Sequence, residues 1–162
     1  MNDNENLKIK TVNDSLTEQT YIVMQGHING SGRLFGGQLL AWIDELAGIV
    51  AMRHSGGTAI TASIDNLQFK RGAHLNDLVV LVGRITYVGS SSMEVRIDTY
   101  VEDHDGSRHP INRAYFVMVA LDENEKPKTV PRLIVDSVEQ QAEWDAAVKR
   151  NAFRKQRKLE GF

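Results

Sequence analysis

The sequence predicts an α+β fold in which a long central helix is wrapped by a curved antiparallel β-sheet and is followed by a C-terminal helix. Three observations lead to this prediction. Apolar residues recur with a helical period over residues 37–52, strand-like segments fill residues 58–122, and a helical period returns after Val135. Successive strands joined by short turns run antiparallel, and twisted strands must curve in order to cover a helix.

Length and composition describe one globular domain. The 162 residues are close to the roughly 150 of a typical domain, and 41% hydrophobic with 25% charged residues is ordinary for a soluble protein. No run approaches the ~18 apolar residues of a membrane span, and the N-terminus does not resemble a signal peptide. Cysteine is absent, which excludes disulfides and thiolate nucleophiles. We therefore expect a cytoplasmic protein that does not interact with a membrane.

The charge is unevenly distributed along the chain. The net charge is −2, yet residues 149–158 carry only basic charged side chains, so the rest of the chain is acidic. A nucleic-acid-binding domain would need a broad basic surface, and we expect no nucleic-acid partner. The changes in polarity and charge along the sequence divide the chain into a polar N-terminal segment (1–18), a folded domain (19–135) and a C-terminal helix with a basic end (136–162).

The first part of the chain leads into the central helix. Residues 7–12 and 21–24 predict short strands, and a glycine-rich segment follows at residues 27–37. The apolar face of the central helix contains Leu39, Trp42, Ile43, Leu46, Ala47 and Val50. Because the opposite face carries small residues such as Ala41 and Gly48, we expect this helix to be covered nearly all round.

Four strands are predicted after the helix. Between Thr58 and Phe69 the apolar pattern changes phase near Asp65-Asn66, which predicts a β-bulge. Residues 81–102 alternate as two strands joined at Gly89–Ser91, and the hairpin signal Asp105-Gly106 leads to a last strand. That strand, residues 114–122, is apolar on both faces, so we expect both faces to be covered.

Several familiar sites are missing from the sequence. It contains no G-x-S-x-G nucleophile elbow, no phosphate-binding P-loop and no dinucleotide-binding glycine spacing. The five histidines show no metal-ligand spacing, and we expect no metal ion.

Asp44 is the most informative polar residue. It lies seven residues after Gly37, too far inside the helix to cap it. An aspartate within an apolar helix is costly unless it is paired or used, so it is either bonded to a neighbouring loop or functional. Desolvation would make its carboxylate a better base.

The start of the helix is a second candidate site. Gly36-Gly37 leaves backbone N–H groups unobstructed at the positive end of the helix dipole, where they can hold an anion or a developing oxyanion. Asn29, in the approach to the helix, offers a neutral donor and acceptor, although by itself it reads as a turn residue.

These residues form a pattern that resembles a known family. The run Asn29-x-x-Gly32-x-Leu34-Phe35-Gly36-Gly37-x-Leu39-x-x-Trp42-x-Asp44-Glu45 is similar to cytosolic acyl-CoA thioesterases of the hotdog superfamily, in the acyl-CoA hydrolase branch. The likeness covers about residues 20–135 and continues through Thr61–Asp65 with Phe69, Val88–Met93, Phe116–Asp122 and Val130–Leu133. The chain departs from the family pattern at Gln25–Ile28, Gly72 and Asn76-Asp77, close to the substrate entrance of the relatives. The resemblance implies the hotdog fold, a helix wrapped by a curved antiparallel sheet.

The resemblance also implies the reaction, which is hydrolysis of an acyl-CoA thioester to free CoA and a fatty acid. We predict that Asp44 is the general base that activates water, or alternatively a nucleophile that forms a mixed anhydride. The N–H groups of Gly37 and Gln38 would polarise the carbonyl, and Asn29 would orient the water or the thioester. Candidates for binding the CoA phosphates are Lys70, Arg71, Arg84, Gly89, Ser90, Ser91 and Ser92. No cofactor is expected, since CoA is part of the substrate.

The relatives form dimers by joining their sheets, and three dimers then assemble into a trimer of dimers. The resemblance therefore implies a homohexamer in which each site takes Asn29 from one subunit and Asp44 from its partner. The C-terminal helix is expected to pack on a neighbouring subunit through Val138, Ala142, Trp144 and Phe153, with contact to RNA or an acidic protein as the alternative.

Two other functions remain open at this stage. A hotdog hydratase or dehydratase would need a histidine on the helix or on the facing strand. A non-catalytic acyl-CoA sensor would carry an added DNA-binding region.

Overall fold

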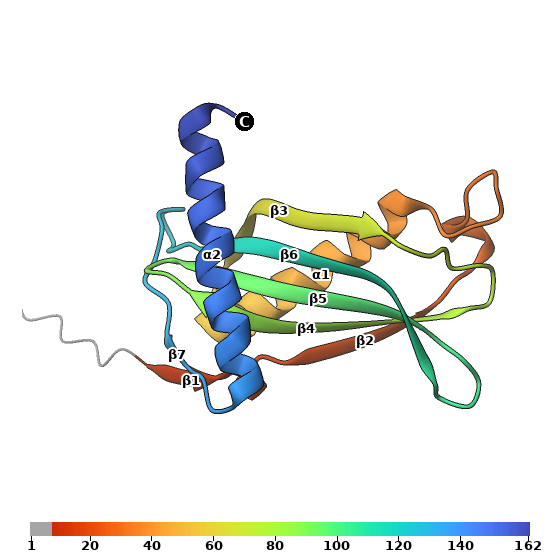
Figure 1. Ribbon diagram of the computed structural model, residues 1–162, viewed down its shortest axis with the longest axis horizontal. Helices are drawn as coiled ribbons and strands as arrows, with labels where there is room; N and C mark the ends of the chain where they lie inside the picture. The colour runs from red at the N-terminus through yellow and green to blue at the C-terminus, as the bar shows by residue number, and fades with distance from the viewer. Residues whose placement is uncertain (1–7) are drawn as a thin grey trace, which may run out of the picture.

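The computed structural model describes residues 8–162, so the first residue of the strand predicted at residues 7–12 lies outside the described part. In chain order the elements are β1 (Ile9–Thr11), the 3₁₀ turn η1 (Val12–Asp14), β2 (Thr17–Ile22), the 3₁₀ turn η2 (Gln25–His27), α1 (Gly36–Ser55), β3 (Ala59–Phe69), β4 (Leu78–Val88), β5 (Ser92–Glu102), β6 (Arg108–Ala120), β7 (Arg132–Ile134) and α2 (Val138–Glu160). Figure 1 shows the two helices on opposite faces of one curved sheet. The predicted fold class is confirmed.

The main sheet has five antiparallel strands in the order β2-β4-β5-β6-β3. The four strands predicted after the helix are all present, and β2 extends the sheet because residues 17–22 pair with residues 78–83 of β4. A separate parallel pair joins β1 to β7. β3 forms one edge of the sheet and pairs with β6 alone, so its outer edge is open to further pairing.

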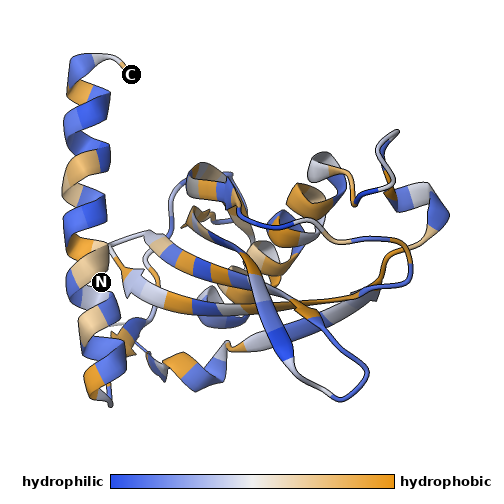
Figure 2. Ribbon diagram, turned by 45° about the vertical axis from the view of Figure 1, so that its right-hand side comes forward, coloured by the Kyte–Doolittle hydropathy of each residue, from blue (hydrophilic) through white to orange (hydrophobic). Residues whose placement is uncertain are grey.

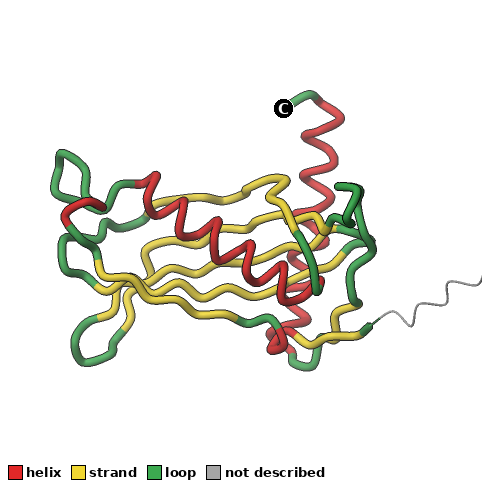
Figure 3. The backbone as a smooth tube through the Cα atoms, turned by 180° about the vertical axis from the view of Figure 1, so that it is seen from behind, coloured by secondary structure: helices red, strands yellow, loops and turns green. Residues whose placement is uncertain are grey.

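α1 crosses the concave face of the sheet, as the view from behind shows (Figure 3). Its predicted apolar residues are buried, with Ile43, Leu46, Ala47 and Val50 at 0% exposure. The approach is closest at Gly83 of β4, where an added Cβ would lie 2.9 Å from Val50 Cγ2 and 3.2 Å from Leu46 Cγ. A side chain at this position would push the helix off the sheet.

The prediction that α1 is covered nearly all round is wrong for the single chain. Ala41, Asp44, Glu45 and Met52 are exposed and Gly48 is half-buried. The physical reason is that five strands cover only the side of the helix that faces them. The opposite stripe of α1, which lies beside the open edge of β3, is not covered by any of residues 8–162.

β3 is irregular in the way the phase change predicts. Its pairing with β6 shifts between Asp65 and Gln68, close to the predicted bulge, and shifts again between Thr61 and Ser63. Each bulge bends the strand and lets it curl around α1.

α2 covers the convex face of the sheet. Glu94 on β5 is 1% exposed and accepts hydrogen bonds from Arg150 and Arg154 of α2, at 2.7 and 2.9 Å, while Arg154 also bonds Asp65 of β3. Residues 114–120 of β6 are buried or half-buried, as expected for a strand that is covered on both faces. In Figure 2 the C-terminal half of α2 is largely hydrophilic and projects beyond the sheet.

Trp144, which was expected to contact a neighbouring subunit, has a packing partner within its own chain. The indole packs on Tyr87 of the same chain, with ring centroids 4.6 Å apart, because α2 folds back onto its own sheet. Val138, Ala142 and Phe153 are exposed and remain available for a neighbouring subunit. Among residues 8–162, no helix is long and apolar enough to cross a membrane.

Candidate active site

The loop before α1 holds Asn29 in a tight local structure. Its side-chain oxygen accepts hydrogen bonds from the N–H groups of Ser31 and Arg33, at 2.9 and 3.2 Å. Its own backbone N–H donates to the Arg33 carbonyl at 2.8 Å. Since the oxygen is used by the loop, the side-chain group that Asn29 can offer to a substrate is its amide N–H₂.

The first turn of α1 has unused donors. The helix begins without a side-chain cap, and no hydrogen bond of the described residues uses the N–H of Gly36 or Gly37. The predicted partner Gln38 differs, because its N–H donates to the Phe35 carbonyl at 3.0 Å. At position 37 an added Cβ would lie 2.5 Å from the exposed Phe35 ring, which would have to move aside. The donors left for an oxyanion are thus the N–H groups of Gly36 and Gly37.

A basic cavity of about 270 Å³ opens at this helix start. The structure brings Asn29, Lys70 and Arg71 together there, and Arg33 joins them. The aliphatic part of the Arg33 side chain passes over Gly72, where an added Cβ would lie 3.3 Å from Arg33 Cδ. Arg33 could not be singled out from the sequence, because it occupies an unspecified position between Gly32 and Leu34 of the motif. Three cations beside a helix N-terminus suit a phosphate group.

Asp44 lies in a different hollow, a groove of about 670 Å³ between α1 and the outer edge of β3. Thr61 on β3 donates a hydrogen bond to Asp44 Oδ1 at 2.6 Å. The sequence analysis did not single out Thr61; the signal was its place at the start of the Thr61–Asp65 segment of the resemblance. The expected desolvation of Asp44 is wrong for the single chain, in which the residue is exposed because nothing covers this side of α1.

Within one chain, Asp44 and the helix start cannot act on the same carbonyl. Seven residues of helix at 1.5 Å each separate Gly37 from Asp44 by about 10 Å. An oxyanion donor and a general base must each lie about 3 Å from the reacting atoms. Asn29 and Asp44 accordingly line separate hollows.

The other candidates for CoA binding lie far from Asn29 in the same chain. Lys70 and Arg71 precede β4 and the turn Gly89–Ser92 follows it, and a strand of 11 residues spans about 36 Å. The turn is also engaged, because the Gly89 carbonyl accepts from Arg132 and the Ser90 carbonyl accepts from the Val130 N–H.

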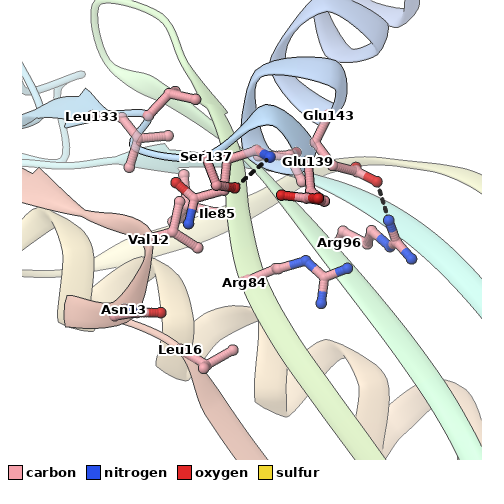
Figure 4. Close-up of a pocket in the computed structure, with 13 residues that line it drawn as sticks. Val12, Asn13, Leu16, Arg84, Ile85, Arg96, Leu133, Ser137, Glu139 and Glu143 are labelled. Carbon is pink, nitrogen blue, oxygen red and sulfur yellow. Dashed lines mark hydrogen bonds and ion pairs between the residues drawn. The ribbon is translucent and has the colours of Figure 1, made fainter.

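Arg84 lines a third cavity, of about 520 Å³, between the sheet and the start of α2 (Figure 4). Its guanidinium lies 3.4 Å from Asp98, and the neighbouring Arg96 pairs with Asp98 and with Glu143 of α2. Both arginines that face this cavity are thus paired with a carboxylate, whereas Arg33, Lys70 and Arg71 form no ion pair among residues 8–162.

The histidine of α1 is structural. His54 is 0% exposed, and its Nε2 lies 2.9 Å from the Pro131 carbonyl. Burial lowers its pKa, which keeps the ring neutral, so Nε2–H is the donor. No cluster of metal-ligating side chains occurs within residues 8–162.

A long helix in a curved antiparallel sheet, with free N–H groups at its start and a carboxylate halfway along it, is the arrangement that the resemblance to hotdog thioesterases implies. The family model of the Thioesterase superfamily matches residues 31–107. A relative from Bacillus subtilis named as an uncharacterized acyl-CoA thioester hydrolase, YkhA, is 38% identical over 80% of this chain and 76% of its own length. The chain belongs to the acyl-CoA thioester hydrolases of this superfamily.

Solved structures agree over nearly the whole chain. An apo-hexameric acyl-CoA thioesterase is 36% identical with a TM-score of 0.89, covering 93% of this chain and 97% of its own. An acyl-CoA hydrolase from Staphylococcus aureus, solved with butyryl-CoA, CoA and CoA disulfide, is 33% identical with a TM-score of 0.89, covering 94% and 93%. That hydrolase has also been solved with an asparagine, an aspartate or a threonine replaced by alanine. The mouse cytosolic acyl coenzyme A thioester hydrolase is 28% identical over 83% of this chain, which spans 36% of that relative's length.

Proposed function

We propose that this enzyme hydrolyses acyl-CoA thioesters to free CoA and a fatty acid, with Asp44 acting on the thioester carbonyl. The observation that carries the proposal is the short hydrogen bond from Thr61 to Asp44. It holds the carboxylate at one end of the groove between α1 and β3. The replaced asparagine, aspartate and threonine of the Staphylococcus aureus hydrolase have the same spacing as Asn29, Asp44 and Thr61, each numbered one lower. This coincidence supports assigning all three residues to the site.

The chemistry follows from the two halves of the site. The N–H groups of Gly36 and Gly37, at the positive end of α1, stabilise the negative charge that develops on the carbonyl oxygen. Asp44 removes a proton from the attacking water, and the CoA thiolate departs. In the second route Asp44 attacks the carbonyl directly, expels the CoA thiolate and forms a mixed anhydride, which water then hydrolyses to the fatty acid. The Asn29 amide donates to the thioester or orients the water.

Each site is built from two subunits in this proposal. The helix start and Asn29 of one subunit face Asp44 of the partner subunit, because the two features lie too far apart within one chain to share a carbonyl. The open edge of β3 supplies the surface for joining two sheets. The likeness to hexameric thioesterases supports a homo-oligomer, which we propose to be a trimer of such dimers.

Arg33, Lys70 and Arg71 bind the CoA phosphates in this proposal. Arg84 and the Gly89–Ser92 turn can reach a CoA only from another subunit of the assembly. We propose that no metal ion or further cofactor takes part, so that dialysis against a chelator leaves turnover unchanged. A cytoplasmic location is proposed from the likeness to the mouse cytosolic enzyme.

The test is Asp44→Asn, which preserves shape and removes the base. We expect kcat for butyryl-CoA to fall by about 10²–10⁴ while CoA binding is kept. The control is Glu123→Gln, which removes one negative charge from an exposed turn. Near-normal turnover by a folded Asp44→Asn protein would rule out this assignment of Asp44.

A further inference from the structure

We infer that the groove beside Asp44 holds the acyl chain of the substrate, and that Gly48 and Met52 set the longest chain accepted. The inference rests on the proposed function and assigns it a substrate class, medium-length acyl groups.

The first argument is the arrangement of the groove along α1. Asp44, Gly48 and Met52 follow one another at intervals of four residues, so they form one stripe on the helix. β3 provides the facing wall through Ala59, Ile60 and Thr61. The groove thus runs from the reactive carboxylate at one end to the Met52 thioether at the other.

The second argument is chemical. Beyond Asp44, Glu45 and Thr61, the residues that line the groove are apolar or glycine: Gly48, Ile49, Met52, Ala59, Ile60 and Met118. Two of them are unusually exposed for their type, Met52 at 45% and Ile60 at 49%. An acyl chain attached to a carbonyl at Asp44 would cover this surface and remove it from water.

The third argument concerns Gly48 itself. Glycine in the interior of a helix is less stable than alanine, so a glycine there calls for a reason. An added Cβ at Gly48 would meet no atom within 4 Å, so the position is not needed for close packing within the chain. What the missing side chain leaves free is the middle of the groove.

The length of the groove gives the expected chain length. Eight residues of helix from Asp44 to Met52 span about 12 Å. An extended chain advances about 1.2 Å per bond, as the extended polypeptide backbone does. About ten carbons therefore fit between the carboxylate and Met52, and about five fit before Gly48.

The experiment compares wild-type protein with Gly48→Ala, Gly48→Leu and Met52→Ala on a panel of saturated acyl-CoAs from two to sixteen carbons. We expect wild-type kcat/KM to rise up to about ten carbons. Gly48→Leu should keep the two- and four-carbon substrates within about threefold and lose at least tenfold at eight carbons or more. Met52→Ala should extend the rise to longer chains.

Gly48→Ala distinguishes an effect on the groove from an effect on folding. It should raise the melting temperature, because alanine favours the helix, while still lowering kcat/KM for long chains. The control is Ala152→Leu, which places the same leucine on an exposed face of α2. It should leave the chain-length profile unchanged.

Binding to the Asp44→Asn protein distinguishes a failure of this inference from a failure of the proposed function. Calorimetry with bare CoA and the same acyl-CoAs should show affinity rising to about ten carbons, and only to about four after Gly48→Leu is added. An unchanged profile, an equal loss at all lengths, or affinity independent of chain length would overturn the inference. The last result would indicate that side chains of a second subunit fill the groove.

Discussion

The proposed chemistry depends on the contact between Thr61 and Asp44. A carboxylate on an exposed helix face can adopt several rotamers, and only some of them point at a bound thioester. The Thr61 hydroxyl, fixed on β3, selects one through its 2.6 Å bond to Oδ1. In the proposed mechanism Thr61 is therefore a positioning residue and Asp44 the catalytic one.

Replacing Thr61 tests this division of roles. Thr61→Val keeps the shape and removes the donor, and we expect kcat to fall about tenfold to a hundredfold, since a hydrogen bond to a charged group contributes about 1.5–3 kcal/mol. Thr61→Ser keeps the hydroxyl and should restore most of the turnover. Near-normal turnover of Thr61→Val together with a loss in Thr61→Ser would show that the methyl group, and not the hydrogen bond, is what matters.

His54 makes stability depend on pH. Burial lowers its pKa below the ordinary value; the Pro131 carbonyl opposes this, and the positive charges of Lys10 and Arg132 add to it. Below about pH 6.5 the His54 imidazole is therefore protonated in the unfolded chain but stays neutral in the folded protein. Stability is full above that pH and falls as the pH drops toward the folded-state pKa, by at most about 1.4 kcal/mol per pH unit.

Urea unfolding at pH 7.5, 6.5 and 5.5 measures this effect. The free energy of unfolding should decline more steeply for wild type than for His54→Gln, which cannot titrate. Parallel declines would mean that other groups are responsible.

At the scale of elements, the position of α1 on the sheet depends on Gly83. Its missing side chain lets Val50 and Leu46 of the helix approach β4, with Ile97 of β5 only 2.8 Å from the position of an added Cβ. This contact places the whole helix, and with it Asp44 opposite Thr61.

Gly83→Ala should therefore destabilise the protein although alanine suits a strand better than glycine does. We expect a loss of about 1–3 kcal/mol, the usual cost of overpacking a core. Gly57→Ala, at a position with open space, is the control. Thermal and urea denaturation of both variants give the comparison, and equal stabilities would mean that α1 can shift without cost.

At the scale of the whole molecule, the separation of Asn29 from Asp44 predicts how damaged subunits behave when mixed. Asn29→Ala and Asp44→Ala proteins should each be nearly inactive alone. Co-expressed in equal amounts, half of the dimers are mixed, and each mixed dimer has one intact site and one doubly damaged site. About a quarter of wild-type activity should return.

Tagging the two variants differently and purifying through both tags isolates the mixed assemblies. Their thiol release from an acyl-CoA gives the readout. Mixed assemblies without recovered activity would place Asn29 and Asp44 in the same subunit's site and refute the shared site.

Local patterns were sufficient for most of the fold. The helical period of Leu39 through Val50 predicted α1, the alternation of residues 81–102 predicted β4 and β5, and the phase change near Asp65 predicted a bulge in β3. These signals survive because each element buries one regular face, and the spacing of that face is written in the chain itself. Asp44 and the glycines of the helix start could be singled out for the same reason, as exceptions to a regular pattern.

Only the tertiary structure decided which residues meet. Thr61 reaches Asp44, Arg33 joins Lys70 and Arg71, and Trp144 turns inward onto Tyr87 through the packing of elements distant in sequence, which no local spacing records. The exposure of Asp44 was mispredicted because the sequence shows that the second face of α1 carries small residues but does not show what covers that face. Whether that face is covered depends on how far five strands can reach around a helix, which is a property of the assembled sheet.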